Sequence, residues 1–110
     1  MSAMAVKPPR NYLALKNRHA DVIDAVEALG QAVRRAGPID PKTAHLIQLG
    51  AAAAIRSEGS VHSHARRALE AGATPEEIRH ALILLTSTIG FPTVAASLTW
   101  AADVMKKGRK

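Results

Sequence analysis

The segment from Leu46 to Ile55 is apolar on almost every side of the helix that it would form. It reads Leu-Ile-Gln-Leu-Gly, then four alanines and an isoleucine, so Gln48 is its one polar side chain. A helix that is hydrophobic all round is buried in a core or an interface. A chain of 110 residues has only a thin core in which to bury one. We therefore expect this helix to lie at the centre of the fold or between subunits.

Helix start signals flank this segment and recur later in the chain. Asp40-Pro41 and Thr74-Pro75 each place a capping side chain before a proline at the first helical position. Glu77 stands three residues after Thr74, which is the spacing of a capping box. Other signals are typical of helix ends, namely Gly37-Pro38, Gly72 and Gly90-Phe91-Pro92. Ser60 is expected to open the helix that Gly72 closes.

Apolar residues recur at helical spacing between these signals, and no stretch alternates for long enough to indicate a strand. Aromatic residues make up only 3% of the chain, so the core must be built from small and aliphatic side chains that suit closely packed helices. We predict an all-α fold in which residues 11–110 form one compact domain, completed by burial against further copies of the chain. The expected helices cover residues 12–36, 41–55, 60–71, 75–89 and 92–105, after a flexible arm at residues 1–10.

The chain contains no cysteine, which excludes disulfides, thiolate metal sites and thiol nucleophiles. The net charge of +6 suits an anionic partner. Basic residues gather near the two ends without interleaved aromatics, so we expect solubilising ends and no nucleic-acid site. No apolar run has the length of a signal peptide or a membrane span. We expect a cytoplasmic protein with no membrane partner, whose ligand is a small anionic organic molecule.

Several polar side chains that can do chemistry lie between Arg56 and His64. On a helical wheel, Ser57, Ser60 and His64 share a stripe, whereas His62 points almost the opposite way. Ser60 and His64 are four residues apart and could hydrogen-bond, as a base and a nucleophile do. We favour the simpler interpretation, in which Ser60 caps a helix. Because His62 and His64 diverge, these two alone are not expected to chelate one metal ion.

Glu58 is the only carboxylate between Asp40 and Glu70. It is either a general acid or base close to His64 and His45, or a charge that favours a helix start. His45 lies on the apolar helix, where a histidine is either buried with its hydrogen bonds satisfied or catalytic. An arginine such as Arg56 can hold a substrate carboxylate bidentately.

Taken in order along the chain, these segments resemble the carboxymuconolactone decarboxylase and alkylhydroperoxidase AhpD-like family. The resemblance is carried by Asp40 to Ile47, the alanine-rich helix after it, Ser57-Glu58-Gly59-Ser60 with His64, Ala68 to Ile78, and Gly90-Phe91-Pro92. It implies an all-helical fold that assembles into trimers or hexamers. This fits a chain whose central helix is too apolar for a monomer.

The resemblance also implies which chemistry is lost. In the peroxidase branch, a Cys-x-x-Cys pair followed by a histidine performs dithiol exchange, and these positions match Ser57, Ser60 and His64. The acidic residue of that branch matches His45. A serine hydroxyl cannot form the disulfide intermediate, so thiol peroxidase activity is not expected. The decarboxylase branch needs no cysteine, and its acid/base work resembles what Glu58 and His64 could do.

We therefore expect decarboxylation of a small carboxylated lactone or related organic acid, without a metal or an organic cofactor. The expected catalytic residues are His64, Glu58 and His45. The expected substrate-binding residues are Ser57, Ser60, His62 and Arg56. Two alternatives stay open. One is a non-catalytic oligomeric binding or scaffold protein, and the other is a metal-binding protein that uses His45 with His62 or His64 across subunits.

Overall fold

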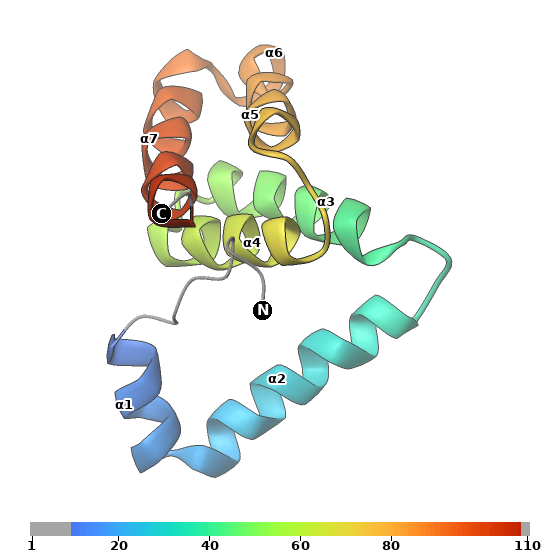
Figure 1. Ribbon diagram of the computed structural model, residues 1–110, viewed down its shortest axis with the longest axis vertical. Helices are drawn as coiled ribbons and strands as arrows, with labels where there is room; N and C mark the ends of the chain where they lie inside the picture. The colour runs from blue at the N-terminus through green and yellow to red at the C-terminus, as the bar shows by residue number, and fades with distance from the viewer. Residues whose placement is uncertain (1–9, 109–110) are drawn as a thin grey trace. The chain divides into compact units, whose positions relative to one another are not determined.

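The computed structural model describes residues 10–108, which form helices and the short turns between them. The helices are α1 (Arg10–Arg18), α2 (Ala20–Arg35), α3 (Pro41–Ala54), α4 (Glu58–Glu70), α5 (Pro75–Ile83), α6 (Thr86–Ile89) and α7 (Phe91–Gly108) (Figure 1). The all-helical prediction is confirmed for this part of the chain. Of the expected N-terminal arm, only Arg10 lies among the described residues, and it begins α1. The described helices fall into two compact units, α1–α2 and α3–α7.

The first unit is a pair of helices, whereas we predicted one continuous helix over residues 12–36. The chain breaks at His19, which has φ of −132° and ψ of 55°. Contacts from α1 to α2 account for the break: the Tyr12 hydroxyl donates to the Glu27 carboxylate, and Lys16 Nζ lies 3.0 Å from Glu27 Oε1. These bonds form only if α1 folds against α2. Neither glycine nor proline marks the position, so the local sequence pattern did not indicate it.

In the second unit, the apolar segment from Leu46 to Ile55 is only partly covered in the single chain, because α3 buries Leu49, Ala52 and Ala53 but leaves Ile47 and Ile55 56% and 75% exposed. Helix α3 packs against α4, α5 and α7, and α7 also packs against α4 and α5. Figure 1 shows α3 and α4 side by side, with α5 and α7 on one side of this pair. Among the fully buried core side chains, the largest are Leu49, Ile78, Leu82 and Val61. Alanines fill much of the remaining core and let the helix backbones approach closely: Ala52, Ala53, Ala65, Ala68, Ala73 and Ala101.

The predicted caps at the starts of α3 and α5 are confirmed. Asp40 Oδ2 accepts the Thr43 amide at 3.2 Å. Thr74 and Glu77 form the full capping box, with bonds of 3.0 and 2.9 Å. The start of α4 differs from the prediction, because Ser57 is the cap and accepts the Ser60 amide at 3.4 Å. Helix α4 therefore begins two residues before Ser60.

The predicted helix over residues 75–89 is interrupted between Ile83 and Thr86, which separates α5 from α6. The Thr86 hydroxyl donates to the Ile83 carbonyl at 2.8 Å, and the Leu85 amide bonds to the Leu82 carbonyl at 3.0 Å. A threonine that bonds to a nearby carbonyl competes with the helical pattern, which explains the break. Among residues 10–108, no helix is long and apolar enough to cross a membrane.

Candidate functional site

Two histidines from neighbouring helices face each other inside the second unit. His45 on α3 is 6% exposed, and its Nδ1 lies 3.3 Å from Nδ1 of the half-buried His64 on α4. The ring centroids are 5.5 Å apart and the rings are tilted by 37°. His45 shares its face of α3 with the buried Leu49, which directs the imidazole into the α3–α4 contact. The two histidines named as catalytic candidates are thus brought together.

This contact makes proton transfer the natural chemistry of the pair. A hydrogen bond between two imidazole nitrogens requires one of them to carry a proton and the other to accept it. A proton given up by one ring can be replaced through the other, which is the behaviour expected of a general acid or base. Burial against aliphatic side chains strengthens the interaction of such a pair with a charged ligand.

Glu58 does not join this pair, contrary to the expectation that it lies close to His64. Its Oε2 atom is 3.9 Å from Nε2 of His62, four residues along α4. On the other side, Asp103 Oδ2 of α7 lies 3.2 Å from the same nitrogen. Glu58 and His64 are six residues apart, which turns them about 120° from each other around the helix. The candidate residues on α4 therefore divide into two clusters, one facing α3 and one facing α7.

The two serines in the cysteine-like positions differ in their surroundings. Ser57 Oγ is used as the N-cap of α4, so its contact is structural. Ser60 lies in the first turn of α4, half-buried, on the same stripe as His64. Ser60 thus stays a candidate for contact with a ligand at the histidine pair.

Arg56 has a positive φ of 57°, which no other non-glycine residue of the described chain shares. Its amide bonds to the Ala53 carbonyl and the Ser57 amide bonds to the Ala52 carbonyl, which is the Schellman pattern at a helix end. The Arg56 side chain donates from Nη1 to Thr93 Oγ1 at 2.8 Å. This bond holds the guanidinium beside the start of α7, and its fork of N–H groups suits a carboxylate.

Gln48 is a polar residue of α3 to which our sequence analysis gave no role. Its Oε1 atom is buried and accepts no hydrogen bond within the described residues. Gln48 lies three residues beyond His45, about one turn along the same helix. A buried acceptor without a donor costs about 1–3 kcal/mol, which a ligand or water donor would recover. Gln48 is the one polar side chain in the apolar stretch from Leu46 to Ile55, and this pattern could have identified it as a candidate from the sequence.

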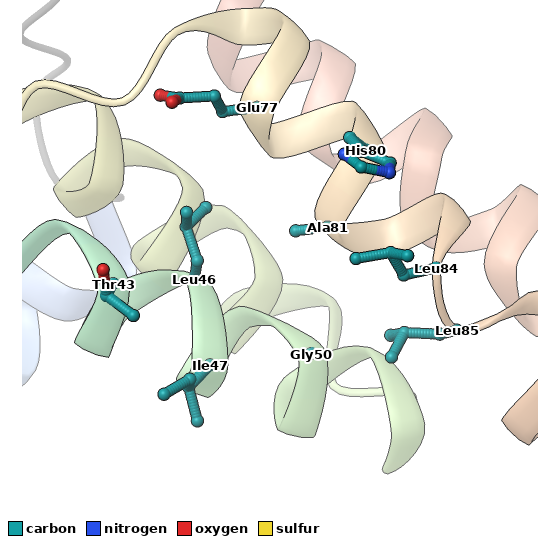
Figure 2. Close-up of a pocket in the computed structure, with 9 residues that line it drawn as sticks. All are labelled: Thr43, Leu46, Ile47, Gly50, Glu77, His80, Ala81, Leu84 and Leu85. Atoms are coloured by element: carbon teal, nitrogen blue, oxygen red, sulfur yellow. The ribbon is translucent and has the colours of Figure 1, made fainter.

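An open groove of about 380 Å³ lies between α3 and α5 (Figure 2). Its walls are mostly apolar, with Glu77, His80 and Thr43 as the polar members. Figure 2 shows Leu46 and Ile47 of α3 across from Leu84 and Leu85. The α3 residues of the groove are turned by about 100° or more from His45, so the groove and the histidine pair lie on different faces of the helix. None of the predicted site residues lines this groove.

Comparison with known families gives a match to the carboxymuconolactone decarboxylase family over residues 20–103. This range runs from the start of α2 into α7 and contains every candidate residue of both clusters. The chain belongs to the carboxymuconolactone decarboxylase family. The resemblance drawn from the sequence is thereby confirmed. No curated protein matches the chain.

This member of the carboxymuconolactone decarboxylase family has no cysteine. The positions that resemble the family's thiol pair are Ser57 and Ser60, and neither hydroxyl can enter a disulfide. In this chain the place holds an imidazole pair, His45 and His64. Its second imidazole, His45, stands where the resemblance places an acidic residue.

Proposed function

We propose that the chain decarboxylates a small carboxylated lactone or related organic acid by acid/base chemistry at the His45–His64 pair. The observation that carries this proposal is the 3.3 Å contact between the two Nδ1 atoms. Membership of the carboxymuconolactone decarboxylase family supports the substrate class. The lack of cysteine supports the choice of acid/base over thiol chemistry.

The reaction needs one proton and no oxidant. The bond between the carboxylate carbon and its neighbour breaks, carbon dioxide leaves, and the electron pair delocalises onto the conjugated carbonyl as a dienolate. His64, protonated, donates to the carbon that lost the carboxylate, and His45 relays a proton from water to restore it. The positive charge on the pair stabilises the dienolate before this transfer.

The other candidate residues take supporting roles in this proposal. Arg56 binds the substrate carboxylate through its N–H fork, and Ser60 and the buried Gln48 amide contact oxygen or hydroxyl groups of the ring. Ser57 serves the fold as a cap. Glu58 and His62, which contact each other on the other side of α4, contribute only if the substrate reaches that face.

The test measures carbon dioxide release from a panel of carboxylated lactones and β-keto acids, with a thiol-dependent peroxide assay in parallel. We expect release from at least one lactone and no peroxide reduction. His64→Asn should lower kcat by about 10²–10⁴-fold, the usual contribution of a general acid or base. His19→Asn, at an exposed position before α2, is the matched control and should leave turnover unchanged. Peroxidase activity, or full turnover by His64→Asn, would contradict the proposal.

Glu58→Gln is the companion variant in the same assay. Our sequence analysis expects it to abolish turnover, whereas its contact with His62 places it away from the pair. Loss of turnover with an intact helical circular dichroism spectrum assigns Glu58 a catalytic role. Retained turnover confines the chemistry to His45 and His64.

A non-catalytic oligomeric protein is the second candidate function, and one observation favours it. Ser57 lies at one of the two positions that match the thiol pair, and it caps α4. Its contribution to helix stability accounts for a serine at this position without any catalytic role. Under this alternative, no member of the panel releases carbon dioxide while the chain still assembles with itself.

Self-association is part of both candidates, and we propose that α2 provides a surface for it. Four of its side chains, Val22, Val26, Leu29 and Val33, are each more than half exposed in the single chain. Their spacing of four, three and four residues makes one continuous apolar stripe. An exposed stripe of this kind is typical of a helix that packs against a partner.

A further inference from the structure

Glu58, His62 and Asp103 bring three metal-ligating side chains together where α4 meets α7. One ligand atom from each lies within 4.8 Å of the other two. Two of these side chains come from one face of α4, four residues apart, and the third comes from α7, 41 residues beyond His62. The whole chain has only nine acidic residues against fifteen lysines and arginines, so two carboxylates on one imidazole are a local departure from its basic character.

A hydrogen bond or ion pair with His62 accounts for only one of the two carboxylates. His62 Nε2 can carry one hydrogen, and Asp103 Oδ2 at 3.2 Å is placed to accept it. Glu58 Oε2 at 3.9 Å is beyond a hydrogen bond to that nitrogen. The two carboxylates also repel each other at this separation. A divalent cation between the three groups would satisfy both negative charges at once.

The distances suit such a cation. Tetrahedral zinc holds nitrogen and oxygen ligands at about 2.0–2.2 Å, which places the ligand atoms about 3.3–3.6 Å apart. His62 Nε2 and Asp103 Oδ2 are already close to this separation, at 3.2 Å. Glu58 Oε2 has to approach His62 Nε2 from 3.9 Å, and its side chain is 57% exposed and able to rotate. One imidazole with two carboxylates is a donor set that zinc and neighbouring divalent transition metals accept.

We propose that Glu58, His62 and Asp103 form a binding site for a divalent cation of the zinc type, with at least one coordination position open to water or an anion. The site shares no residue with the His45–His64 pair, because His62 and His64 diverge by about 160° around α4. It also differs from a site shared by His45 and His64, since all its ligands lie at the α4–α7 contact. Metal binding would join α4 to α7.

The test is a titration of the untagged, chelator-treated chain with Zn²⁺, followed by calorimetry. We expect one Zn²⁺ per chain. His62→Ala and Asp103→Asn should each weaken binding at least tenfold, while His19→Asn, the exposed histidine control, should not change it. Equal affinities for the unsubstituted chain and His62→Ala would overturn the proposal. Loss of binding in His64→Asn with binding kept in His62→Ala would overturn it too, because the metal would then belong to the other pair.

A second measurement guards against variants that fail to fold. Saturating Zn²⁺ should raise the Tm of the unsubstituted chain, because a ligand that binds only the folded state stabilises it. The Tm of Asp103→Asn, whose side chain has nearly the same shape, should not respond, although its circular dichroism spectrum stays helical. An equal rise in both proteins would show that these carboxylates do not hold the metal.

Discussion

At the residue scale, Arg56 stands out because its backbone conformation suits glycine. Helices α3 and α4 end in the same Schellman pattern, and the left-handed position is Arg56 in the first and Gly72, with φ of 105°, in the second. A left-handed conformation costs a residue with a Cβ atom about 1–2 kcal/mol. Strain of this kind is found where a side chain serves a function. The guanidinium held on Thr93 is consistent with such a role for Arg56.

The left-handed backbone at Arg56 predicts that a glycine variant is more stable than an alanine variant at this position. Arg56→Gly and Arg56→Ala both remove the bond to Thr93, but only glycine relieves the left-handed backbone. We expect Arg56→Gly to be the more stable of the two by about 1 kcal/mol in urea unfolding. Both variants should raise KM in the decarboxylation assay to a similar extent. An alanine variant as stable as the glycine variant would show that Arg56 is not strained.

Some contacts of the candidate site residues could be predicted from the sequence, and others could not. His45 and His64 were both predicted as site residues, and their contact follows from helical periodicity and the pairing of α3 with α4. The contact between Glu58 and His62 was predictable in the same way, because the two residues are four apart on α4. Asp103 was not predictable, because it is distant in sequence and approaches His62 only through the packing of α7 on α4.

At the element scale, helix starts were predicted well because their causes are local. The capping box of α5 needs only Thr74 and Glu77, which are three residues apart. The start of α4 was misplaced because Ser57 and Ser60 both qualify as caps, and the choice depends on how α3 ends. The break at His19 was missed because its cause is a contact between α1 and Glu27.

The same capping box predicts how stability depends on pH. The pKa of Glu77 is lowered from its ordinary value of 4.5, because its carboxylate accepts the Thr74 amide and pairs with Lys42. A lowered pKa means that this contribution is complete above pH 4.5 and is lost as the pH falls through the lower, folded-state value. We expect the free energy of unfolding to fall in acid, and Glu77→Gln to reduce this dependence.

Glu76→Gln is the matched control for this measurement, since the exposed Glu76 lies in the same turn and pairs with Arg79. It should keep the acid dependence of the unsubstituted chain in urea titrations at several pH values. An equal acid dependence in Glu77→Gln would show that the capping carboxylate is not its source.

At the scale of the whole molecule, the exposed stripe of α2 is the feature that a single chain does not explain. In the single chain, Val26 and Leu29 are 57% and 63% exposed. Burial of such side chains contributes roughly 1.5–3 kcal/mol each, which favours assembly. Sequence periodicity indicates that a face will be covered, but it does not say which molecule covers it.

Substitution of this stripe tests the assembly. Val26→Glu places a charge in the centre of the apolar stripe, and we expect it to reduce the molar mass measured by light scattering toward that of one chain, 11.7 kDa. Gln31→Glu introduces the same charge on the opposite side of α2 and should leave the mass unchanged. An assembly of unchanged mass in Val26→Glu would exclude this stripe as the interface.

The position of α4 has a consequence for the candidate sites as a group. This 13-residue helix carries His64 on the side of α3 and His62 on the side of α7, and the Arg56–Thr93 bond joins its N-terminal end to α7. A helix of this length moves as a stiff rod, so a displacement at one contact is transmitted to the others. A cation bound between Glu58, His62 and Asp103 would therefore change the alignment of the imidazoles on the opposite side of the rod.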